Sequence, residues 1–235
     1  MRDALVGGAL AAAAAASVSW AAPAPHQVPD TIAQRVQACA ACHGQQGVAT
    51  REGYLPRIAG KPAGYLYNQL LNFRDGRRHS GAMERLTRNM TDAYLQEIAG
   101  HFAALDLPYA PTPARLPAAA AELERGAQLV QRGDAALRVP ACTQCHGAAM
   151  TGIAPAIPGL LGLPRDYVLA QLGAWRAGQR RAHAPDCMGQ ISRRLDAADL
   201  NAVASYLAMQ AMPANAQPAP ALPAPLPMSC GGIAR

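Results

Sequence analysis

Apolar residues recur every three or four positions in six segments of the chain, the spacing of an amphipathic helix. Leu66, Leu70 and Phe73, for example, fall on one face of such a segment. Thr91 and Asp196 stand where two of the segments begin and are predicted to cap them. The predicted helices cover residues 31–41, 65–74, 91–105, 120–131, 166–175 and 196–209. The pattern therefore predicts a helical fold.

The helical pattern belongs to a unit that occurs twice. The sequence C-A-A-C-H-G at residues 39–44 recurs as C-T-Q-C-H-G at residues 142–147. Downstream, Tyr-Leu and Gln-Leu within residues 65–70 match Tyr-Val and Gln-Leu within residues 167–172. Self-similarity at this spacing indicates a tandem duplication of one unit of about 100 residues.

The duplication sets the predicted domain boundaries. The first domain covers residues 23–107 and the second covers residues 118–212. Residues 108–117 carry four prolines and are predicted to form a stiff linker. Residues 213–235 are an alanine–proline tract without periodicity, which cannot bury a core and is predicted to be extended or disordered.

Residues 1–22 have the features of an export signal. An alanine-rich apolar run precedes small residues at the two positions that a signal peptidase reads. The run is too short to cross a bilayer as a helix. We therefore expect a signal peptide and a periplasmic protein. The alternative is an uncleaved N-terminal segment that keeps the protein at the membrane surface.

Four of the six cysteines lie in the two C-x-x-C-H motifs. In such a motif both thiols add to the vinyl groups of haem, and the histidine binds the iron. The expected covalent attachment residues are Cys39, Cys42, Cys142 and Cys145, with His43 and His146 as axial ligands. A thioredoxin-like redox pair would need a strand before the motif, and none is predicted. One shared zinc site would need to join two distant ligand pairs.

The second axial ligand should lie well downstream of each histidine. Met83 follows His43 by 40 residues, and Met188 follows His146 by 42. Both methionines lie in polar stretches that are predicted to be loops. A thioether ligand raises the haem potential and suits electron transfer, so we expect Met83 and Met188 to bind the two irons. The alternative is that they are packing methionines.

Other residues are candidates for supporting the haems. The carbonyl of Pro56 or Pro158 is placed to accept the ring N–H of the motif histidine, although either proline could equally belong to an ordinary turn. Arg57, Arg74 and Arg176 could pair with haem carboxylates, since a guanidinium matches a carboxylate. The alternative for these arginines is a solvated helix face.

Cys187 and Cys230 lie outside the motifs. In an oxidising compartment they could form a disulfide that ties the tail beside the second haem. Cys187 directly precedes Met188, so it is also an alternative iron ligand. The third alternative is that both thiols are free.

The formal net charge is +6, carried by twenty arginines and one lysine that are spread along the chain. There is no basic block and no interleaved aromatic platform, which argues against nucleic-acid binding. A mildly basic carrier is steered toward acidic partners.

The chain resembles the diheme cytochrome c4 family over residues 30–210. The resemblance rests on the two motifs, on L-P-R-I-A-G-K at residues 55–61, and on a methionine seven residues before a helix start in each unit. It implies two all-α cytochrome c domains related by pseudo-twofold symmetry, with His/Met ligation of each iron.

The resemblance also implies electron transfer rather than catalysis. The expected donor is a dehydrogenase or a bc-type complex, and the expected acceptor is a terminal oxidase or reductase. Two alternatives stay open. The chain could be the cytochrome subunit of a dehydrogenase complex, as in a flavocytochrome sulfide dehydrogenase, or a diheme enzyme of the peroxidase kind.

Overall fold

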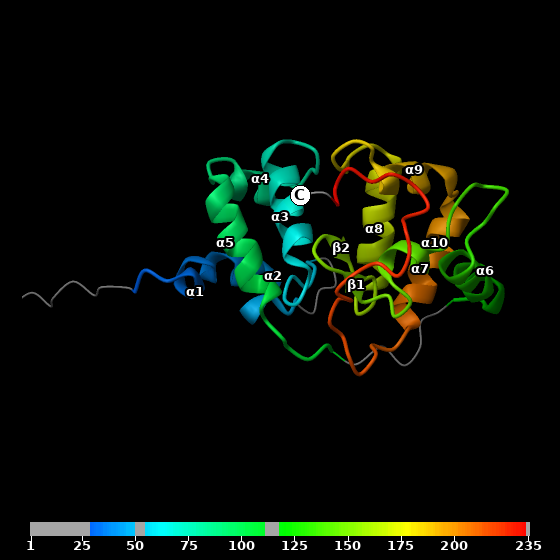
Figure 1. Ribbon diagram of the computed structural model, residues 1–235, viewed down its shortest axis with the longest axis horizontal. Coiled ribbons are helices and arrows are strands. Elements are labelled where there is room, and N and C mark those ends of the chain that lie inside the picture. Colours follow the sequence, from blue (N-terminus) through cyan, green and yellow to red (C-terminus); the bar gives the residue numbers. More distant parts are fainter. Residues whose placement is uncertain (1–28, 50–54, 111–117, 234–235) are drawn as a thin grey trace, which may run out of the picture.

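The structure, a computed structural model, describes residues 29–49, 55–110 and 118–233 (Figure 1). It is mainly helical, with two domains that each hold one motif, so the predicted fold class is confirmed. The first domain contains α1 (Ile32–Arg35), α2 (Gln37–His43), the 3-10 helix η1 (Gln45–Gly47), α3 (Ala63–Arg74), α4 (Gly81–Thr87) and α5 (Asp92–Ala103). The second contains α6 (Ala120–Gln131), α7 (Cys142–His146), β1 (Gly152–Ile153), β2 (Ile157–Pro158), α8 (Arg165–Arg176), α9 (Cys187–Arg194) and α10 (Ala197–Met209).

The core of the first domain joins α3, α5 and the segment of α1 and α2. Leu66 of α3 lies in one buried cluster with Ile98 and Phe102 of α5, which are one helical turn apart and share a face. Val36 also lies in this cluster, at the junction between α1 and α2. The single helix predicted over residues 31–41 is therefore two short helices that meet at a buried residue.

The core of the second domain lies between α6, α8 and α10. Leu129 of α6, Leu172 of α8 and Leu207 of α10 belong to one buried cluster. A Cβ at Gly126 would clash with the carbonyl of Ala202, so glycine allows the close approach of α6 and α10. This packing fixes α6 next to α7, which carries the second motif.

The predicted caps of α5 and α10 are confirmed. The Thr91 side chain accepts a hydrogen bond from the amide of Tyr94 at 3.3 Å. The Asp196 carboxylate accepts one from the amide of Asp199 at 2.8 Å. Each cap satisfies an amide that has no partner within its helix, and so fixes where the helix begins.

The segments that carry Met83 and Met188 are helices, α4 and α9, and the prediction that they are loops is wrong. Each helix has only seven or eight residues, too few for an apolar stripe to repeat. Asp186 caps α9 by accepting from the amide of Gly189 at 2.9 Å. In α4 the amide of Ser80 donates instead to the Glu84 side chain, also at 2.9 Å.

A small antiparallel hairpin of β1 and β2 follows α7. Gly152 pairs with Pro158, and Ile153 pairs with Ile157. Two-residue strands show no alternation of polar and apolar positions, so the sequence does not predict them. The hairpin positions Pro158 beside the second motif.

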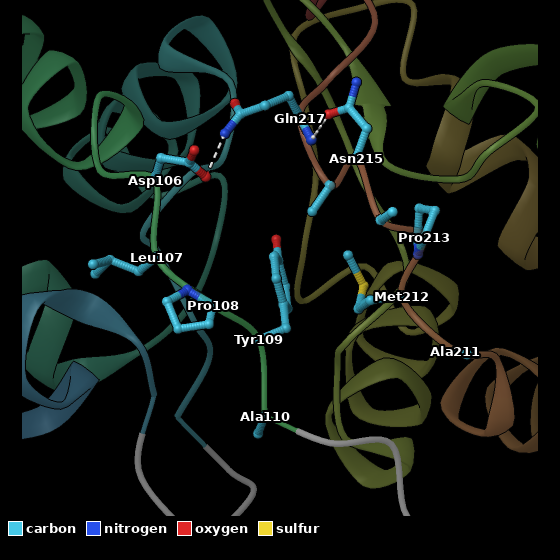
Figure 2. Close-up of a pocket in the computed structure, with 12 residues that line it drawn as sticks. Asp106, Leu107, Pro108, Tyr109, Ala110, Ala211, Met212, Pro213, Asn215 and Gln217 are labelled. Atoms are coloured by element: carbon cyan, nitrogen blue, oxygen red, sulfur yellow. Dashed lines mark hydrogen bonds between the residues drawn. The ribbon is translucent and has the colours of Figure 1, made fainter.

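Residues 213–233, which we call the C-terminal strap, are extended but not disordered. Ala219 accepts a hydrogen bond from Ala154 at 2.8 Å and donates one to Gly152 at 2.9 Å. Gln217 donates to Asp106 of the first domain at 2.7 Å (Figure 2). Of the two predicted states, extended or disordered, the strap therefore adopts the extended one. The strap needs no core of its own, because it is fastened to folded domains and its prolines lose little entropy on ordering.

Some predictions fall outside the described residues. These are the signal peptide at 1–22, most of the linker (111–117) and the last two residues of the tail. Within the part of the chain that the structure describes, no helix combines the length and apolarity needed to cross a membrane.

Candidate haem sites

Each C-x-x-C-H motif lies on a short helix that ends at its histidine. α2 ends at His43, and α7 ends at His146. Two cysteines three positions apart on a helix share a face, so both thiols of a motif can reach one flat ligand. The glycines that follow, Gly44 and Gly147, have φ values of 76° and 84°, which favour glycine. The chain therefore leaves the helix sharply beyond each histidine.

Both motif histidines are buried and held by a backbone carbonyl. Nδ1 of His43 donates to the carbonyl of Pro56 at 2.9 Å, and Nδ1 of His146 donates to that of Pro158 at 2.8 Å. Burial lowers the pKa of both imidazoles, which favours the neutral ring. Because a carbonyl only accepts, the proton lies on Nδ1 and Nε2 keeps its lone pair for a metal. The predicted role of the two proline carbonyls is confirmed.

The four motif cysteines are free thiols in the structure. Burial raises the pKa of Cys142 to about 12, and also raises the pKa values of Cys39 and Cys145. A thioredoxin-like pair needs a thiol with a lowered pKa, which these three lack. No group of three or more His, Cys, Asp or Glu side chains lies close enough to hold a metal within residues 29–49, 55–110 and 118–233. The raised pKa values of these three thiols therefore disfavour a thioredoxin-like redox pair.

One cavity of about 540 Å³ extends through both domains. It is lined by every predicted site residue, namely Cys39, Cys42, His43, Met83, Cys142, Cys145, His146 and Met188. Met83 reaches it from α4 and Met188 from α9, and both side chains are half-buried. In each domain the structure thus places the two motif cysteines, the motif histidine and the candidate methionine on the same cavity.

Buried cations line this cavity. The four are Arg57, Lys61, Arg78 and Arg180, at 5 %, 5 %, 9 % and 4 % exposure. Burial and the neighbouring Arg57 lower the pKa of Lys61 to about 8. Among the described lining residues Asp186 is the only carboxylate, and it is already engaged in capping α9. Buried cations without a carboxylate partner are costly, so the cavity favours an anionic ligand.

Two of these cations, Arg78 and Arg180, cross the interface between the domains. Arg78 donates to Gln69 at 2.9 Å and to Gln171 at 2.7 Å. Arg180 donates to the same two glutamine oxygens, each at 2.8 Å. Burial and the nearby Arg78 lower the pKa of Arg180. The two guanidinium groups therefore lie close together in the lining of the cavity.

Trp175 adds a further polar group to the cavity. Its ring lies under the Arg180 guanidinium, with Cζ 3.7 Å from the ring centroid. In the first domain the ring of Phe73 lies under Arg78 in the same way, with Cζ 4.5 Å from the ring centroid. The indole Nε1–H is buried and has no hydrogen-bond acceptor among the described residues. A haem carries two propionate carboxylates. These match both this donor and the buried cations that have no carboxylate partner in the cavity lining. The residues present therefore fit the haem groups that the motifs predict.

The three arginines that the sequence suggests as partners of haem carboxylates bind other groups of the protein instead. Arg57 lines the cavity, but its guanidinium donates to three backbone carbonyls. Arg74 pairs with Asp75 and Asp92, and Arg176 donates to the Leu195 carbonyl. Neither Arg74 nor Arg176 lines the cavity. The sequence did carry a signal for Arg78 and Arg180, since both follow the matched glycine of the repeat by two residues.

Known proteins resemble this chain over most of its length. The family model described as Cytochrome c matches residues 123–210. A thiosulfate dehydrogenase electron acceptor from Thiomonas intermedia is 35 % identical over 201 residues, covering 86 % of this chain and 90 % of that protein. Cytochrome c4 from Pseudomonas aeruginosa is 32 % identical over 186 residues, covering 77 % and 89 %.

Solved structures share the fold. Reduced cytochrome c4 from Pseudomonas stutzeri superposes with a TM-score of 0.64 at 26 % identity, over 75 % of this chain and 95 % of that one. A thiosulfate dehydrogenase from Marichromatium purpuratum gives a TM-score of 0.64 at 33 % identity, over 72 % of this chain. The matched region is 36 % of that longer protein. The chain belongs to the cytochrome c4 family of diheme electron-transfer cytochromes, which carry two covalently bound haem c groups.

Proposed function

We propose that this chain is a periplasmic electron carrier that accepts electrons from a thiosulfate dehydrogenase and delivers them to a terminal acceptor. The observation that carries the proposal is the paired geometry of the two motifs. Each histidine donates from Nδ1 to a proline carbonyl. Both histidines and the two methionines, Met83 and Met188, line the same cavity. Relatives named as electron acceptors of thiosulfate dehydrogenase support the choice of donor.

The assignment of residues follows the repeat. The first haem is attached at Cys39 and Cys42, with His43 and Met83 as axial ligands. The second haem is attached at Cys142 and Cys145, with His146 and Met188 as axial ligands. The unprotonated Nε2 of each histidine supports this assignment, since it is the only ring nitrogen left to bind iron.

Bound haem supplies a one-electron exchange at its iron. The chain contributes rigidity, charge and exclusion of other ligands. Thioether links to the motif cysteines and the packed helices would hold the group, and Met83 or Met188 would supply a ligand that closes the iron to small molecules. Arg78 and Arg180 compensate carboxylate charge where the two halves of the cavity meet. These features favour electron transfer over catalysis.

Export to the periplasm is supported by a feature of the mature chain. Cys187 and Cys230 form a disulfide, which confirms the first of the three alternatives for these thiols. Disulfides persist in oxidising compartments and are rare in the cytosol. The disulfide therefore agrees with the signal expected at residues 1–22.

A second candidate function is that of a cytochrome subunit bound permanently to its dehydrogenase. The match to one third of a longer thiosulfate dehydrogenase favours this alternative, because it places a similar unit within the enzyme. Co-purification separates the two. A carrier leaves the dehydrogenase at physiological salt, whereas a subunit stays bound.

The test uses the mature holoprotein, with its covalent haem counted by pyridine haemochrome. Purified thiosulfate dehydrogenase and thiosulfate are added, and reduction of the haems is followed by absorbance. We expect both haems to be reduced only when enzyme and thiosulfate are both present. Oxidised protein that ascorbate reduces but the enzyme does not would overturn the proposed donor. Rapid carbon monoxide binding by the ferrous protein would instead favour a diheme enzyme.

A further inference from the structure

We propose that the C-terminal strap positions Met188, so that methionine ligation at the second haem depends on the Cys187–Cys230 disulfide. The inference rests on the proposed assignment of Met188 as an axial ligand. It makes Cys187 and Cys230 positioning residues, which act on the iron through the methionine beside them.

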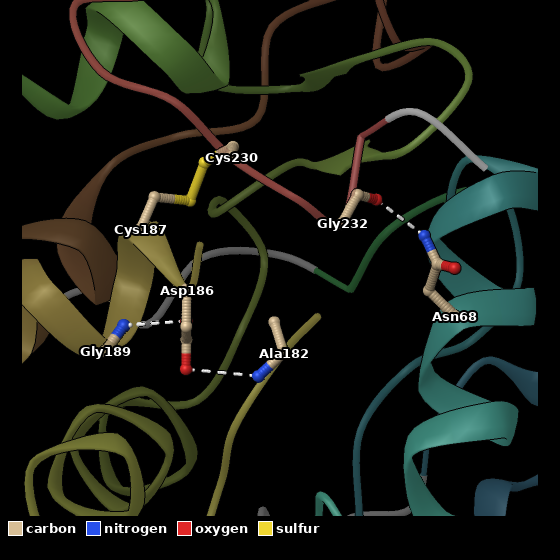
Figure 3. Close-up of a disulfide and its surroundings, with 7 residues drawn as sticks. All are labelled: Asn68, Ala182, Asp186, Cys187, Gly189, Cys230 and Gly232. Atoms are coloured by element: carbon tan, nitrogen blue, oxygen red, sulfur yellow. Dashed lines mark hydrogen bonds between the residues drawn. A yellow bond between two sulfur atoms is a disulfide. The ribbon is translucent and has the colours of Figure 1, made fainter. Parts of the chain in front are cut away.

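The disulfide lies directly beside the proposed ligand. Cys187 is the first residue of α9 and Met188 is the second, and the Cα atoms of the two bridged cysteines are 5.2 Å apart (Figure 3). The amide of Gly231 donates to the carbonyl of Pro185 at 2.9 Å. The strap therefore holds the chain at two points just before Met188, once covalently and once by a hydrogen bond.

The strap is closely seated against the segment that leads into α9. A Cβ at Gly231 would clash with the carbonyl of Ala184 and would lie 2.7 Å from that of His183. Only glycine allows the two backbones to approach this closely. Residues 183–185 thus have strap backbone on one side, which limits how far the start of α9 can move.

The far end of the strap is anchored in the first domain. Asn68 of α3 is 4 % exposed, and its Nδ2 donates to the carbonyl of Gly232 at 2.6 Å (Figure 3). Further back, Gln217 reaches Asp106 of the first domain (Figure 2). The strap is therefore held on both domains, and it cannot swing away from α9 while these contacts persist.

The strap also forms part of the cavity wall. Met228, Cys230, Gly232 and Ile233 line the same cavity as Met188. Releasing the strap would remove apolar wall next to the second haem and admit water. Water and small ligands would then compete with the thioether for the sixth position of the iron.

The first domain lacks this device and serves as an internal control. Met83 lies on α4, where Ser80 donates to Glu84 and the hydroxyl of Thr87 donates to the carbonyl of Met83. No disulfide joins this helix to another segment within the described residues. Loss of the Cys187–Cys230 bridge should therefore act on one haem and leave the other unchanged.

The first experiment compares the holoprotein with the double variant Cys187→Ser and Cys230→Ser. Proton NMR of the ferrous protein resolves an upfield methyl signal for each ligating methionine, and Met83→Ala assigns the two. We expect the variant to keep both haems but to lose the Met188 signal. We also expect it to bind about one carbon monoxide per chain, where the parent binds none, and to lower one midpoint potential.

A second measurement avoids any failure of the variant to mature. Treating the parent holoprotein with a water-soluble phosphine breaks the disulfide and leaves two thiols, while the phosphine is oxidised to its oxide with oxygen from water. Thiol counting verifies the cleavage. We again expect carbon monoxide to bind at the second haem alone. Asn68→Ala, which removes the contact of the strap with α3 but keeps the disulfide, should retain the Met188 signal.

The possible failures separate the inference about the strap from the assignment of Met188 as a ligand. If the disulfide is broken and both methionine signals, both potentials and the exclusion of carbon monoxide persist, the strap does not position Met188 and the inference is wrong. The same holds if the Met83 signal is the one lost. If the untreated parent already lacks a Met188 signal, the assignment of Met188 as ligand fails instead, which is a failure of the proposed function.

Discussion

Arg78 and Arg180 pair backbone to backbone across the domain interface, as an isolated antiparallel bridge between equivalent positions of the repeat. Their guanidinium groups donate to the same two glutamine oxygens and line the same cavity. Two buried cations this close are unfavourable without an anion. The interface therefore favours an anionic group close to these two side chains.

Removing one of these cations should lower a haem potential. Arg78→Gln takes away positive charge that opposes the ferric state, so we expect one or both midpoint potentials to fall by about 30–70 mV. Spectroelectrochemistry of the holoprotein measures the change. Arg77→Gln is the matched control, because Arg77 is one residue away, pairs with Asp75 and does not line the cavity. An equal shift in the control would show that net charge, rather than position, is responsible.

Trp175 should raise the potential of the second haem through its unpaired indole N–H. Trp175→Phe gives the second domain the residue that the first has at Phe73. The phenyl ring can still lie under Arg180, but it cannot donate a hydrogen bond to a carboxylate. We expect the second potential to fall by a few tens of millivolts, corresponding to a lost hydrogen bond of about 1 kcal/mol. Unchanged potentials would mean that the indole donates to no haem carboxylate.

The disulfide should also contribute to global stability. Cys187 and Cys230 are 43 residues apart, and closing a loop of this size restricts the unfolded chain by about 4 kcal/mol. The double serine variant should therefore unfold at lower denaturant, with a free energy of unfolding reduced by about 3–4 kcal/mol. Guanidinium titration of the holoprotein followed by circular dichroism measures this. An unchanged midpoint would contradict the prediction, whatever happens at Met188.

An ion-pair network in the second domain should give stability that is lost in acid. Arg125 of α6 pairs with Asp134 at 2.9 Å and with Asp199 of α10 at 2.7 Å. The backbone amide of Leu137 and the Arg125 guanidinium hold the pKa of Asp134 below its usual value of 3.8. A lowered carboxyl pKa stabilises the fold above the unfolded value and loses that effect as pH falls through the folded value.

We therefore expect Asp134→Asn to flatten the pH dependence of unfolding below about pH 4. Urea titrations of the parent and the variant between neutral pH and about pH 3 provide the comparison. Asp166→Asn is the control, since Asp166 pairs with its neighbour Arg165 on an exposed surface. Identical pH profiles for all three proteins would contradict the role given to Asp134.

Much of the fold and site could be predicted because the responsible interactions are local. The two motifs, the caps at Thr91 and Asp196 and the apolar faces of the long helices are fixed by residues close in sequence. The sequence leaves Pro56 and Pro158 open between an acceptor for the histidine N–H and an ordinary turn, and the structure bears out the acceptor at both positions.

The features that were missed depend on short elements or distant contacts. α4 and α9 are too short to display a helical period, so the sequence predicts loops around Met83 and Met188. The order of the strap comes from a disulfide and from contacts with both domains, which its alanine–proline composition does not reveal. Arg78 and Arg180 matter only because the two domains meet, although the repeat places an arginine at both positions.

We expect this chain to hold two covalent haems, each with a histidine and a methionine ligand. The most direct test compares the mature holoprotein with Met83→Ala and Met188→Ala variants. It combines a pyridine haemochrome count with the weak far-red band of ferric iron bound to methionine. We expect two haems in all three proteins, and each variant should lose about half of the band while binding carbon monoxide at one iron. Two haems with the full band retained in either variant would contradict the claim for that methionine, and absence of covalent haem would contradict it entirely.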